Sequence, residues 1–340
     1  MGFGVLVILV GAGAWWGLDY LAHRPPDKEK VERHVTIPHG ASLKKIAQTL
    51  EHEGLVPDWR LFAAYAVRKD VARRLQAGAY RLHTQMTMAE LAEALMKGRS
   101  ERLVTIPEGF TLAQTAQRLA AAGSIGGAEQ FLALGADPQM RRLAGAEGPS
   151  VEGFLFPDTY FFDSSEDAQA IMERMIRAFH QRLAECLTSP TICMGRSVSL
   201  YEIVTLASMI QREARNAQEM PLIASVYYNR LAQGMKLECD ATVRYALGVW
   251  DRSLAYADLK VDSPYNTYRH PGLPPGPICN PGAEALSAAA HPAQSDYLFY
   301  VYRGDGGHEF THTYGEHLAA SEKFIKPIKR ASEIKRRPTP

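Results

Sequence analysis

The chain has 340 residues, enough for two domains, and its 46% hydrophobic and 22% charged residues are typical of a folded globular protein. A formal net charge of +1 gives no indication of a nucleic-acid partner. The four cysteines show neither a disulfide framework nor a metal-site spacing; Cys186 and Cys193 are close enough in sequence to bridge, but free thiols are the preferred interpretation.

The first eighteen residues, MGFGVLVILVGAGAWWGL, carry no charged side chain, which is close to the minimum length of a membrane span. Trp15, Trp16 and Tyr20 stand where an aromatic belt would meet the membrane surface. We therefore predict a transmembrane anchor at residues 1–20 and a linker at residues 21–34. A cleaved signal peptide and a buried core helix are the alternatives. Basic residues follow the segment and none precedes it, so charge bias alone argues against an exported body.

A repeat follows. Residues 35–56 (VTIPHGASLKKIAQTLEHEGLV) and 104–125 (VTIPEGFTLAQTAQRLAAAGSI) are identical at 10 of 22 positions, at a constant offset of 69. Each copy predicts a short strand, a Pro-x-Gly turn, a Ser- or Thr-capped amphipathic helix and a glycine stop. Between them we expect a strand at Tyr80–Leu82 and a Thr-capped helix that ends before Gly98. Such units resemble LysM-like cell-wall-binding modules, so residues 35–103 are predicted to form a LysM-like α/β module. A plain α/β packing unit without a ligand is an equally weighted alternative.

Residues 104–330 are predicted to form a second domain of mixed α+β structure, followed by a basic tail at residues 331–340. Residues 126–200 are expected to be mostly helical, apart from the aromatic-rich segment VEGFLFPDTYFF at 151–162. Further along we expect a β-hairpin at 296–313 and helices at roughly 200–217, 221–234, 240–248 (capped by Asp240), 282–290 and 315–325. The fold class expected for the whole chain is α+β.

The helix expected at LYEIVTLASMIQREAR, residues 200–215, carries a carboxylate of interest. At 3.6 residues per turn, Ile203, Leu206 and Ile210 share a face with Glu213, so this glutamate extends an apolar stripe. Desolvation on such a surface raises the pKa of a carboxyl group, and an acid protonated near neutral pH suits general acid catalysis. The alternative is a glutamate at the rim of the stripe, paired with a neighbouring arginine.

The stretch PYNTYRHPGLPPGPICNPG, residues 264–282, contains six prolines and three glycines. This composition excludes an interior helix or a central strand, but its aromatic and apolar residues are unlike those of a flexible linker. We therefore expect a rigid loop, which would lose little entropy on binding a ligand.

The sequence HEFTH, His308–His312, matches the H-E-x-x-H pattern of zinc proteases, a pattern that requires a helix. The preceding GDGG, together with Phe310, Thr311 and Thr313, favours a strand instead. On a strand the two histidines would lie about 13 Å apart, at ~3.3 Å per residue, which is too far to share one ion. We therefore predict no functional metal site here.

Six motifs occur along the chain in this order: EGFLFPDTY (152–160), LASMIQREA (206–214), SVYYNRL (225–231), YNTY…GLPPGPICNPG (265–282), AAAHP (288–292) and GGHEFTHTYGEH (306–317). Together they resemble the MltG/YceG-like endolytic murein transglycosylases. The resemblance covers nearly the whole chain, and so many motifs in the right order make a chance match very improbable.

The resemblance implies a single-pass inner-membrane protein with its catalytic body, residues 104–330, in the periplasm. It implies cleavage of the MurNAc–GlcNAc β-1,4 bond within nascent peptidoglycan strands to give a 1,6-anhydro-MurNAc end. It therefore implies a role in ending glycan elongation, close to peptidoglycan synthases, with no cofactor. The family's catalytic glutamate is the last acidic residue of an A-S-I-[VI]-E-K-E-like helix, which corresponds to Glu213 in ASMIQREA. Gln211 replaces the first acidic residue of that pattern and so removes one nearby charge.

One carboxyl group suffices for this chemistry because the C6 hydroxyl of the sugar is the nucleophile, whereas hydrolytic glycosidases usually need two. We expect the rigid loop to supply substrate-binding groups at Tyr265, Asn266, Thr267 and Tyr268. Further substrate-binding candidates are Glu152, Asp158, Asn229 and Asp240. The alternative for all of them is a structural role, such as the capping of turns by Asp158 and Asp240.

Two other functions stay open at this point. A non-catalytic wall-binding protein would hold glycan through its LysM-like units and release no anhydro-muropeptides. A two-carboxylate glycoside hydrolase, with Glu213 beside Asp240, would leave a reducing end instead.

Overall fold

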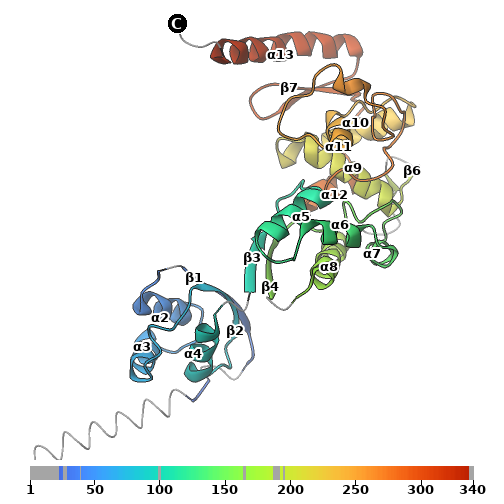
Figure 1. Ribbon diagram of the computed structural model, residues 1–340. Helices are drawn as coiled ribbons and strands as arrows, with labels where there is room; N and C mark the ends of the chain where they lie inside the picture. The colour runs from blue at the N-terminus through green and yellow to red at the C-terminus, as the bar shows by residue number, and fades with distance from the viewer. Residues whose placement is uncertain are drawn as a thin grey trace, which may run out of the picture. The chain divides into compact units, whose positions relative to one another are not determined.

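The computed structural model describes residues 23–25, 29–38, 40–98, 101–163, 166–186, 192–193 and 196–336, of which 101, 192–193, 196 and 326–336 are described by their backbone alone (Figure 1). The predicted anchor at residues 1–20 lies outside them. Within the described ranges, no helix is both long enough and apolar enough to cross a bilayer. The chain forms two compact units, one drawn from Met1–Val104 and Thr159–Glu166 and the other from Thr105–Asp158 and Asp167–Pro340.

The first unit is built on a four-stranded sheet of order β1-β2-β3-β4. Strands β1 and β2 are antiparallel, with Val35 opposite Tyr80, and both residues are buried in a core shared with the three helices. The elements of this unit are β1 (Glu32–Ile37), α2 (Leu43–His52), α3 (Trp59–Arg68), β2 (Gly78–His83), α4 (Met88–Lys97), β3 (Glu101–Thr105) and β4 (Thr159–Asp163). The mixed α+β fold class is confirmed, as is the strand predicted at Tyr80–Leu82.

The predicted helix caps of the repeat are present. Ser42 accepts a hydrogen bond from the Lys45 amide at the start of α2, and Thr87 and Thr111 form capping boxes at the starts of α4 and α5 (Leu112–Ala121). The two copies differ, however, in how their strand and helix are assigned to the two units. The strand and helix of the first copy belong to one unit, whereas in the second copy β3 joins the sheet of the first unit and α5 belongs to the second.

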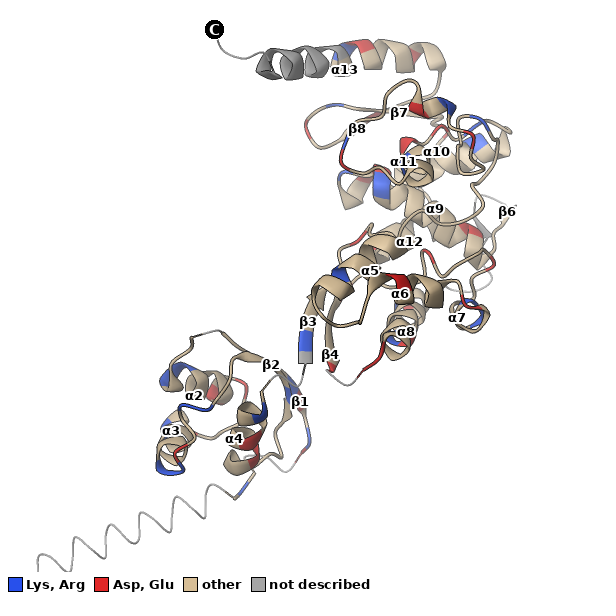
Figure 2. Ribbon diagram, in the orientation of Figure 1, with Lys and Arg blue, Asp and Glu red and all other residues tan. Residues whose placement is uncertain are grey.

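The second unit is mainly helical and carries two small hairpins, and acidic and basic residues are interspersed over it (Figure 2). After α5 its elements are α6 (Ala128–Gly135), α7 (Pro138–Ala144), α8 (Ala168–Cys186), β5 (Ile192–Cys193), β6 (Arg196–Ser197), α9 (Leu200–Glu213), the 3₁₀ turn η1 (Ala217–Glu219), α10 (Met220–Ala232), α11 (Asp240–Leu247), the 3₁₀ turn η2 (Asp258–Lys260), α12 (Ala283–Ala290), β7 (Phe299–Tyr302), β8 (His308–Thr311) and α13 (Tyr314–Arg336). Cys186, at the end of α8, has a free thiol.

Helix α9 is the centre of this unit, where it packs against α10, α11 and α12. All eight residues from Ile203 to Ile210 are buried, so the helix is covered on every side rather than along one stripe. It ends at Glu213 because Ala214 takes an extended backbone, with φ −62° and ψ 141°. The predicted helix at 200–217 is therefore shorter than expected, and its last residue emerges from the core.

The rigid loop at 264–282 is largely a core element. Ile278 and Asn280 are fully buried, and the Ile278 amide donates a hydrogen bond to Ser208 Oγ on α9 at 3.0 Å. The Asn280 side chain accepts from the Leu155 amide at 3.0 Å and donates to the Phe110 carbonyl at 3.0 Å. The prolines therefore fix a path of chain that joins α9 to the segment around residue 155.

Candidate active site

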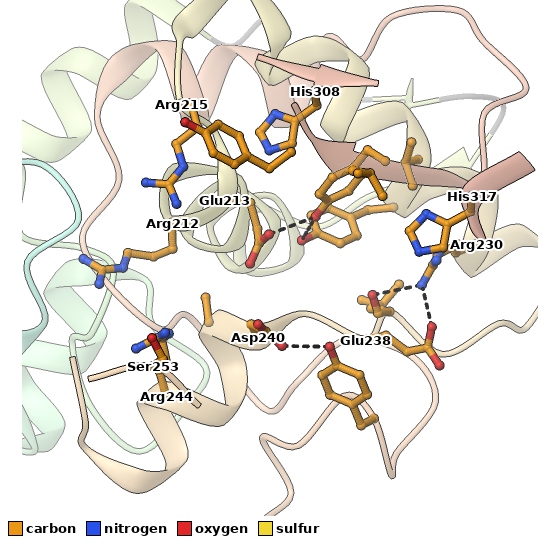
Figure 3. A pocket seen from close by; sticks show the side chains of 18 of the residues that line it. Arg212, Glu213, Arg215, Arg230, Glu238, Asp240, Arg244, Ser253, His308 and His317 are labelled. Carbon is orange, nitrogen blue, oxygen red and sulfur yellow. Dashed lines mark hydrogen bonds and ion pairs between the residues drawn. The ribbon is translucent and has the colours of Figure 1, made fainter. Parts of the chain in front are cut away.

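A cavity of about 880 Å³ lies in the second unit. It is lined by the end of α9, by α10, by the start of α11, by the β7–β8 hairpin and by the first turn of α13 (Figure 3). Its volume is within the range of natural ligand pockets. Its walls carry carboxyl, guanidinium, hydroxyl and imidazole groups beside aromatic rings, a composition suited to a polar ligand with several hydroxyl groups.

Glu213 points into this cavity from the end of α9 (Figure 3). Its Oε1 accepts a hydrogen bond from Cys239 Sγ at 3.3 Å, and its Oε2 accepts one from the Tyr300 hydroxyl at 3.2 Å. The Tyr300 hydroxyl lies 3.1 Å from that of Tyr227. Burial raises the pKa of the Cys239 thiol and of the Tyr227 and Tyr300 hydroxyls well above their ordinary values, so each keeps its proton. The carboxyl group thus faces a set of neutral donors.

Two opposing influences set the protonation of Glu213. Burial raises the pKa of its carboxyl group, and the negative charge of Asp240 adds to this. The hydrogen bonds from Cys239, Tyr300 and the Ala241 amide act in the opposite direction, because they favour the carboxylate. Because burial favours the protonated form and the hydrogen bonds favour the carboxylate, Glu213 can donate a proton and then be stabilised as the anion, as general acid–base catalysis requires.

The neighbouring arginines are not ion-paired with Glu213. The Arg212 guanidinium lies 3.9 Å from the centre of the Trp250 ring, and that of Arg215 lies 5.3 Å from the centre of the Tyr302 ring. Arg212 also donates to the Gly109 carbonyl at 3.1 Å. Among the described residues, Glu213 therefore forms no ion pair with an adjacent arginine, unlike the alternative considered from the sequence.

A strained turn brings Cys239 to Glu213. Glu238 has a φ of 52°, a left-handed conformation that non-glycine residues rarely adopt. Its carboxylate pairs with Arg230 at 3.3 Å, and its amide donates to the Thr267 carbonyl at 3.3 Å. Cys239 is then the N-cap of α11, although its side chain makes no capping bond, and Asp240 is the first helical residue. The prediction that Asp240 caps this helix was wrong by one position.

Three of the predicted site residues meet in the cavity: Glu213, Asp240 and Tyr268. The Tyr268 hydroxyl donates to Asp240 Oδ1 at 2.8 Å, which fixes the carboxylate of Asp240 at the start of α11. Asp240 is exposed, in contrast to the half-buried Glu213. The two carboxyl groups therefore share one cavity but have different surroundings.

Thr267 and Asn266 lie beneath this cavity instead of lining it. Thr267 Oγ1 accepts from the Cys239 amide at 3.0 Å and is 3.0 Å from Thr242 Oγ1. The Asn266 amide group donates to the carbonyls of Leu259 and Val261, both at 2.9 Å, and its side chain is fully buried. Thr267 thereby supports the start of α11, and Asn266 holds the loop that carries Tyr268.

Glu152 lines a second cavity of about 560 Å³, which shares Trp250 and Asp251 with the first. Its carboxyl group accepts from the Leu112 amide at 2.9 and 3.1 Å and from the Tyr245 hydroxyl at 3.3 Å. Burial raises the pKa of Glu152 to about 8.

The remaining predicted binding residues line neither cavity. The Tyr265 ring packs on that of Tyr245, with centroids 4.9 Å apart. Asn229 donates to the carbonyls of Ser295 and Tyr297, both at 2.9 Å. The exposed Asp158 accepts a backbone hydrogen bond from the Ile106 amide at 2.9 Å.

Cys239, Tyr227 and Tyr300 were not predicted from the sequence. Tyr300 and Tyr302 alternate with the buried Phe299 and Val301 on β7, and this period of two was a signal that both tyrosines share the cavity-facing side of the strand. No comparable local signal marks Cys239, since it approaches Glu213 only through the fold.

The histidines of HEFTH have separate partners. His308 lies in β8, as predicted, and its Nδ1 is 2.8 Å from Glu219 Oε2. His312 follows the strand, and its Nε2 is 2.9 Å from Asp296 Oδ1. Among the described residues, no group of three or more His, Cys, Asp or Glu side chains is arranged to hold a metal ion.

Comparison with known proteins agrees with this geometry. The YceG-like family matches residues 35–323. A Bacillus subtilis protein named endolytic murein transglycosylase is 32% identical over 336 residues, which cover 94% of this chain and 91% of that protein. A Streptococcus pneumoniae protein of the same name is 31% identical over 88% of this chain, and this chain spans only 60% of its length. A crystal structure of a yceG-like protein from Listeria monocytogenes is similar with a TM-score of 0.57 and 32% identity, over 86% of this chain and 99% of that one. The resemblance drawn from the motifs is confirmed: this chain belongs to the YceG-like family.

Proposed function

We propose that this chain is an endolytic murein transglycosylase, a lyase that cuts the MurNAc–GlcNAc β-1,4 bond within glycan strands and leaves a 1,6-anhydro end. One observation carries the proposal: Glu213 is a carboxyl group of raised pKa, held by neutral donors in a cavity of about 880 Å³. Relatives that bear this name over most of the chain support it.

The chemistry follows from the two influences on Glu213. The protonated carboxyl group gives its proton to the glycosidic oxygen as the bond to C1 breaks. The resulting carboxylate accepts hydrogen bonds from Cys239 and Tyr300, which lowers the cost of the anion in a half-buried site. It then takes the proton from the C6 hydroxyl as that oxygen attacks C1, which closes the 1,6-anhydro ring and restores the acid.

The test is Glu213→Gln, which keeps the shape of the side chain and removes its proton transfer. The amount of anhydro-muropeptide released from purified murein, measured by mass spectrometry, should fall by about 10²–10⁴-fold, the usual contribution of general acid–base catalysis. Thermal unfolding should change little, since the amide keeps the size and shape of the carboxyl group.

Glu202→Gln is the matched control. Glu202 lies on the same helix, eleven residues earlier and ~16 Å away at ~1.5 Å per residue, and it does not line the cavity. It should leave the release of anhydro-muropeptides unchanged. If Glu213→Gln stays near the wild-type rate, Glu213 is not the acid and the proposal fails.

A second candidate function is hydrolysis, because Asp240 lines the same cavity and its charge acts on Glu213. In that case Asp240 would attack C1 or activate a water, and the product would be a reducing end. The mass of the product separates the two reactions, since an anhydro end is one water lighter than a reducing end. We favour the lyase because the exposed Asp240 is already engaged by Tyr268, and because relatives are named as transglycosylases.

We further propose that the first unit binds glycan in the manner of a LysM-like module, and that residues 1–20 anchor a periplasmic body to the inner membrane near peptidoglycan synthases. The repeat at 35–56 and 104–125 and the uncharged first eighteen residues support this. Retention of residues 30–103 on insoluble murein tests the module. A reporter that works only after export, fused after residue 35, tests the anchor, and an inactive reporter would reject it.

A further inference from the structure

Three arginines at one end of the catalytic cavity form no ion pair with a described residue. Arg212, Arg215 and Arg244, which we term the arginine cluster, all line the cavity, and Figure 3 shows them at the end opposite the Arg230–Glu238 pair. No carboxylate in the described part of the chain lies within ion-pair distance of any of them. The two other arginines that line the cavity differ in this respect, since Arg230 pairs with Glu238 and Arg252 pairs with Asp258 at 2.6 Å.

Two members of the cluster, Arg212 and Arg244, are close enough to act on one another. Burial lowers the pKa of Arg212, and the positive charge of Arg244 acts in the same direction. Arg244 reaches the cavity from α11 and donates only to the Arg252 carbonyl, at 2.5 Å. The charge of Glu213 acts on Arg212 and that of Asp258 acts on Arg244, but neither carboxylate forms an ion pair with these arginines, so an anionic ligand between the guanidinium groups would still gain free energy.

The guanidinium groups are also held in a geometry suited to carboxylates. Arg212 lies flat enough over Trp250 to bring its central carbon 3.9 Å from the ring centroid, and Arg215 packs on Tyr302 at 5.3 Å. An aromatic ring covers the face of a guanidinium and leaves the N–H donors along its edge available. Such an edge binds a carboxylate through two parallel hydrogen bonds. Arg215 forms no hydrogen bond or ion pair with any described residue, so all its donors are available.

A neutral glycan gives such a cluster nothing to bind, but murein glycan carries short peptides whose side chains and C-termini are carboxylates. We propose that the arginine cluster is a carboxylate-binding subsite for the peptide stem of the strand being cut. This inference rests on the proposed function and names the form of its substrate: a glycan with charged stems. The stem next to the scissile bond would lie at the arginine end, with its sugar at Glu213.

The experiment uses the full-length chain and two preparations of uncrosslinked murein strands. One carries stems with free carboxylates, and the other carries the same stems after chemical amidation, which removes the charge and keeps the length. The wild type should cut the first with a kcat/KM at least about tenfold higher, the usual size of one charge-assisted contact. Arg215→Gln with Arg244→Gln should bring this ratio close to one.

The control is Arg142→Gln, which removes one positive charge from an exposed position on α7 that lines neither cavity. It should keep the wild-type ratio, which separates a local effect from a change in net charge. Thermal unfolding of each variant shows whether the loss of the Arg244 hydrogen bond affects the fold, and Arg215→Gln alone, which breaks no hydrogen bond, should still lower the ratio.

A binding measurement tests the carboxylate-binding subsite independently of catalysis. With Glu213→Gln, in which turnover is slowed, strands with free carboxylates should bind at least about tenfold more tightly than amidated strands, and the difference should shrink with added salt. If the wild type cuts nothing but this binding preference is present, the proposed reaction fails and the subsite stands. Equal binding of the two preparations, or an unchanged ratio in the arginine variants, would overturn the subsite.

Discussion

Glu152 provides a sharp test of the electrostatics of the second unit. Its carboxyl group is 6% exposed and accepts hydrogen bonds from the Leu112 amide and the Tyr245 hydroxyl. Burial raises its pKa from 4.5 to about 8, so the group is mainly protonated at neutral pH. In Glu152→Gln, the amide oxygen can still accept from Leu112, and no charge can form.

The magnitude follows from linkage. The folded pKa of Glu152 is above the unfolded one, so the folded state binds more protons and stability falls as pH rises from about 4.5 to about 8. At about 1.4 kcal/mol per pH unit, this range corresponds to about 5 kcal/mol, an upper value because water can reach a charged group when the structure relaxes. Glu152→Gln removes this pH-dependent loss. The variant should match the wild type within about 1 kcal/mol at pH 5 and exceed it by about 2–5 kcal/mol at pH 8.5.

Urea unfolding at pH 5, 7 and 8.5 measures the difference between the two proteins. If the unfolding free energies of the wild type and the variant change with pH in parallel, the reasoning is refuted, because Glu152 would then not carry a raised pKa in the folded state. Release of anhydro-muropeptides at pH 7 gives the second readout. A large loss of release without any change in unfolding would assign Glu152 to the substrate path along the second cavity, as the sequence suggested.

Three further predictions concern the cavity and its supports. Tyr300→Phe removes a hydrogen bond that lowers the pKa of Glu213, so the alkaline limb of the pH–rate profile should move to higher pH. An alkaline limb that stays in place or moves to lower pH would contradict the assignment of Glu213 as the acid. Asn266→Ala leaves two carbonyls and one amide without partners and should cost about 3 kcal/mol of unfolding free energy in urea, whereas a stable variant with poor turnover would restore the binding role expected from the sequence. Gln211→Glu should keep activity but lower stability above neutral pH. The Gln211 side chain donates to the Glu108 carboxylate at 3.1 Å, and a glutamate at position 211 would repel that carboxylate. Thermal melting of the wild type and the variant at pH 6 and pH 8 measures the difference.

Much of the local structure was predictable because local rules decide it. Ser42, Thr87 and Thr111 cap their helices as Ser and Thr do at helix starts, and the alternation of Phe299 to Tyr302 predicts a strand. The raised pKa of Glu213 followed from its position at the end of an apolar helix. These features depend on residues within a few positions of one another.

The surroundings of Glu213 were not predictable, because they depend on distant segments. Cys239 and Tyr300 are 26 and 87 residues further along the chain, and only the packing of α11 against α9 and of β7 against α10 brings them to Glu213. For the same reason the burial of Asn266 was not predictable from the sequence. A polar residue in a rigid loop is equally compatible with holding a ligand and with holding the loop, and burial decides between them.

The meeting of Glu213 with the start of α11 has a consequence for timing. The Ala241 backbone, near the N-terminus of that eight-residue helix, favours the carboxylate form of Glu213 on another helix, while the N-cap residue Cys239 gives no capping bond of its own. A neutral acid is a weak partner for a helix N-terminus, and an anion is a better one, typically by about 0.3–1 kcal/mol. In the proposed reaction, the loss of the proton from Glu213 would therefore hold α11 more firmly, and with it Asp240 and Arg244 on the cavity wall. Proton release and stiffening of the wall would coincide in each turnover, so that the cavity is most rigid while the sugar carries positive charge.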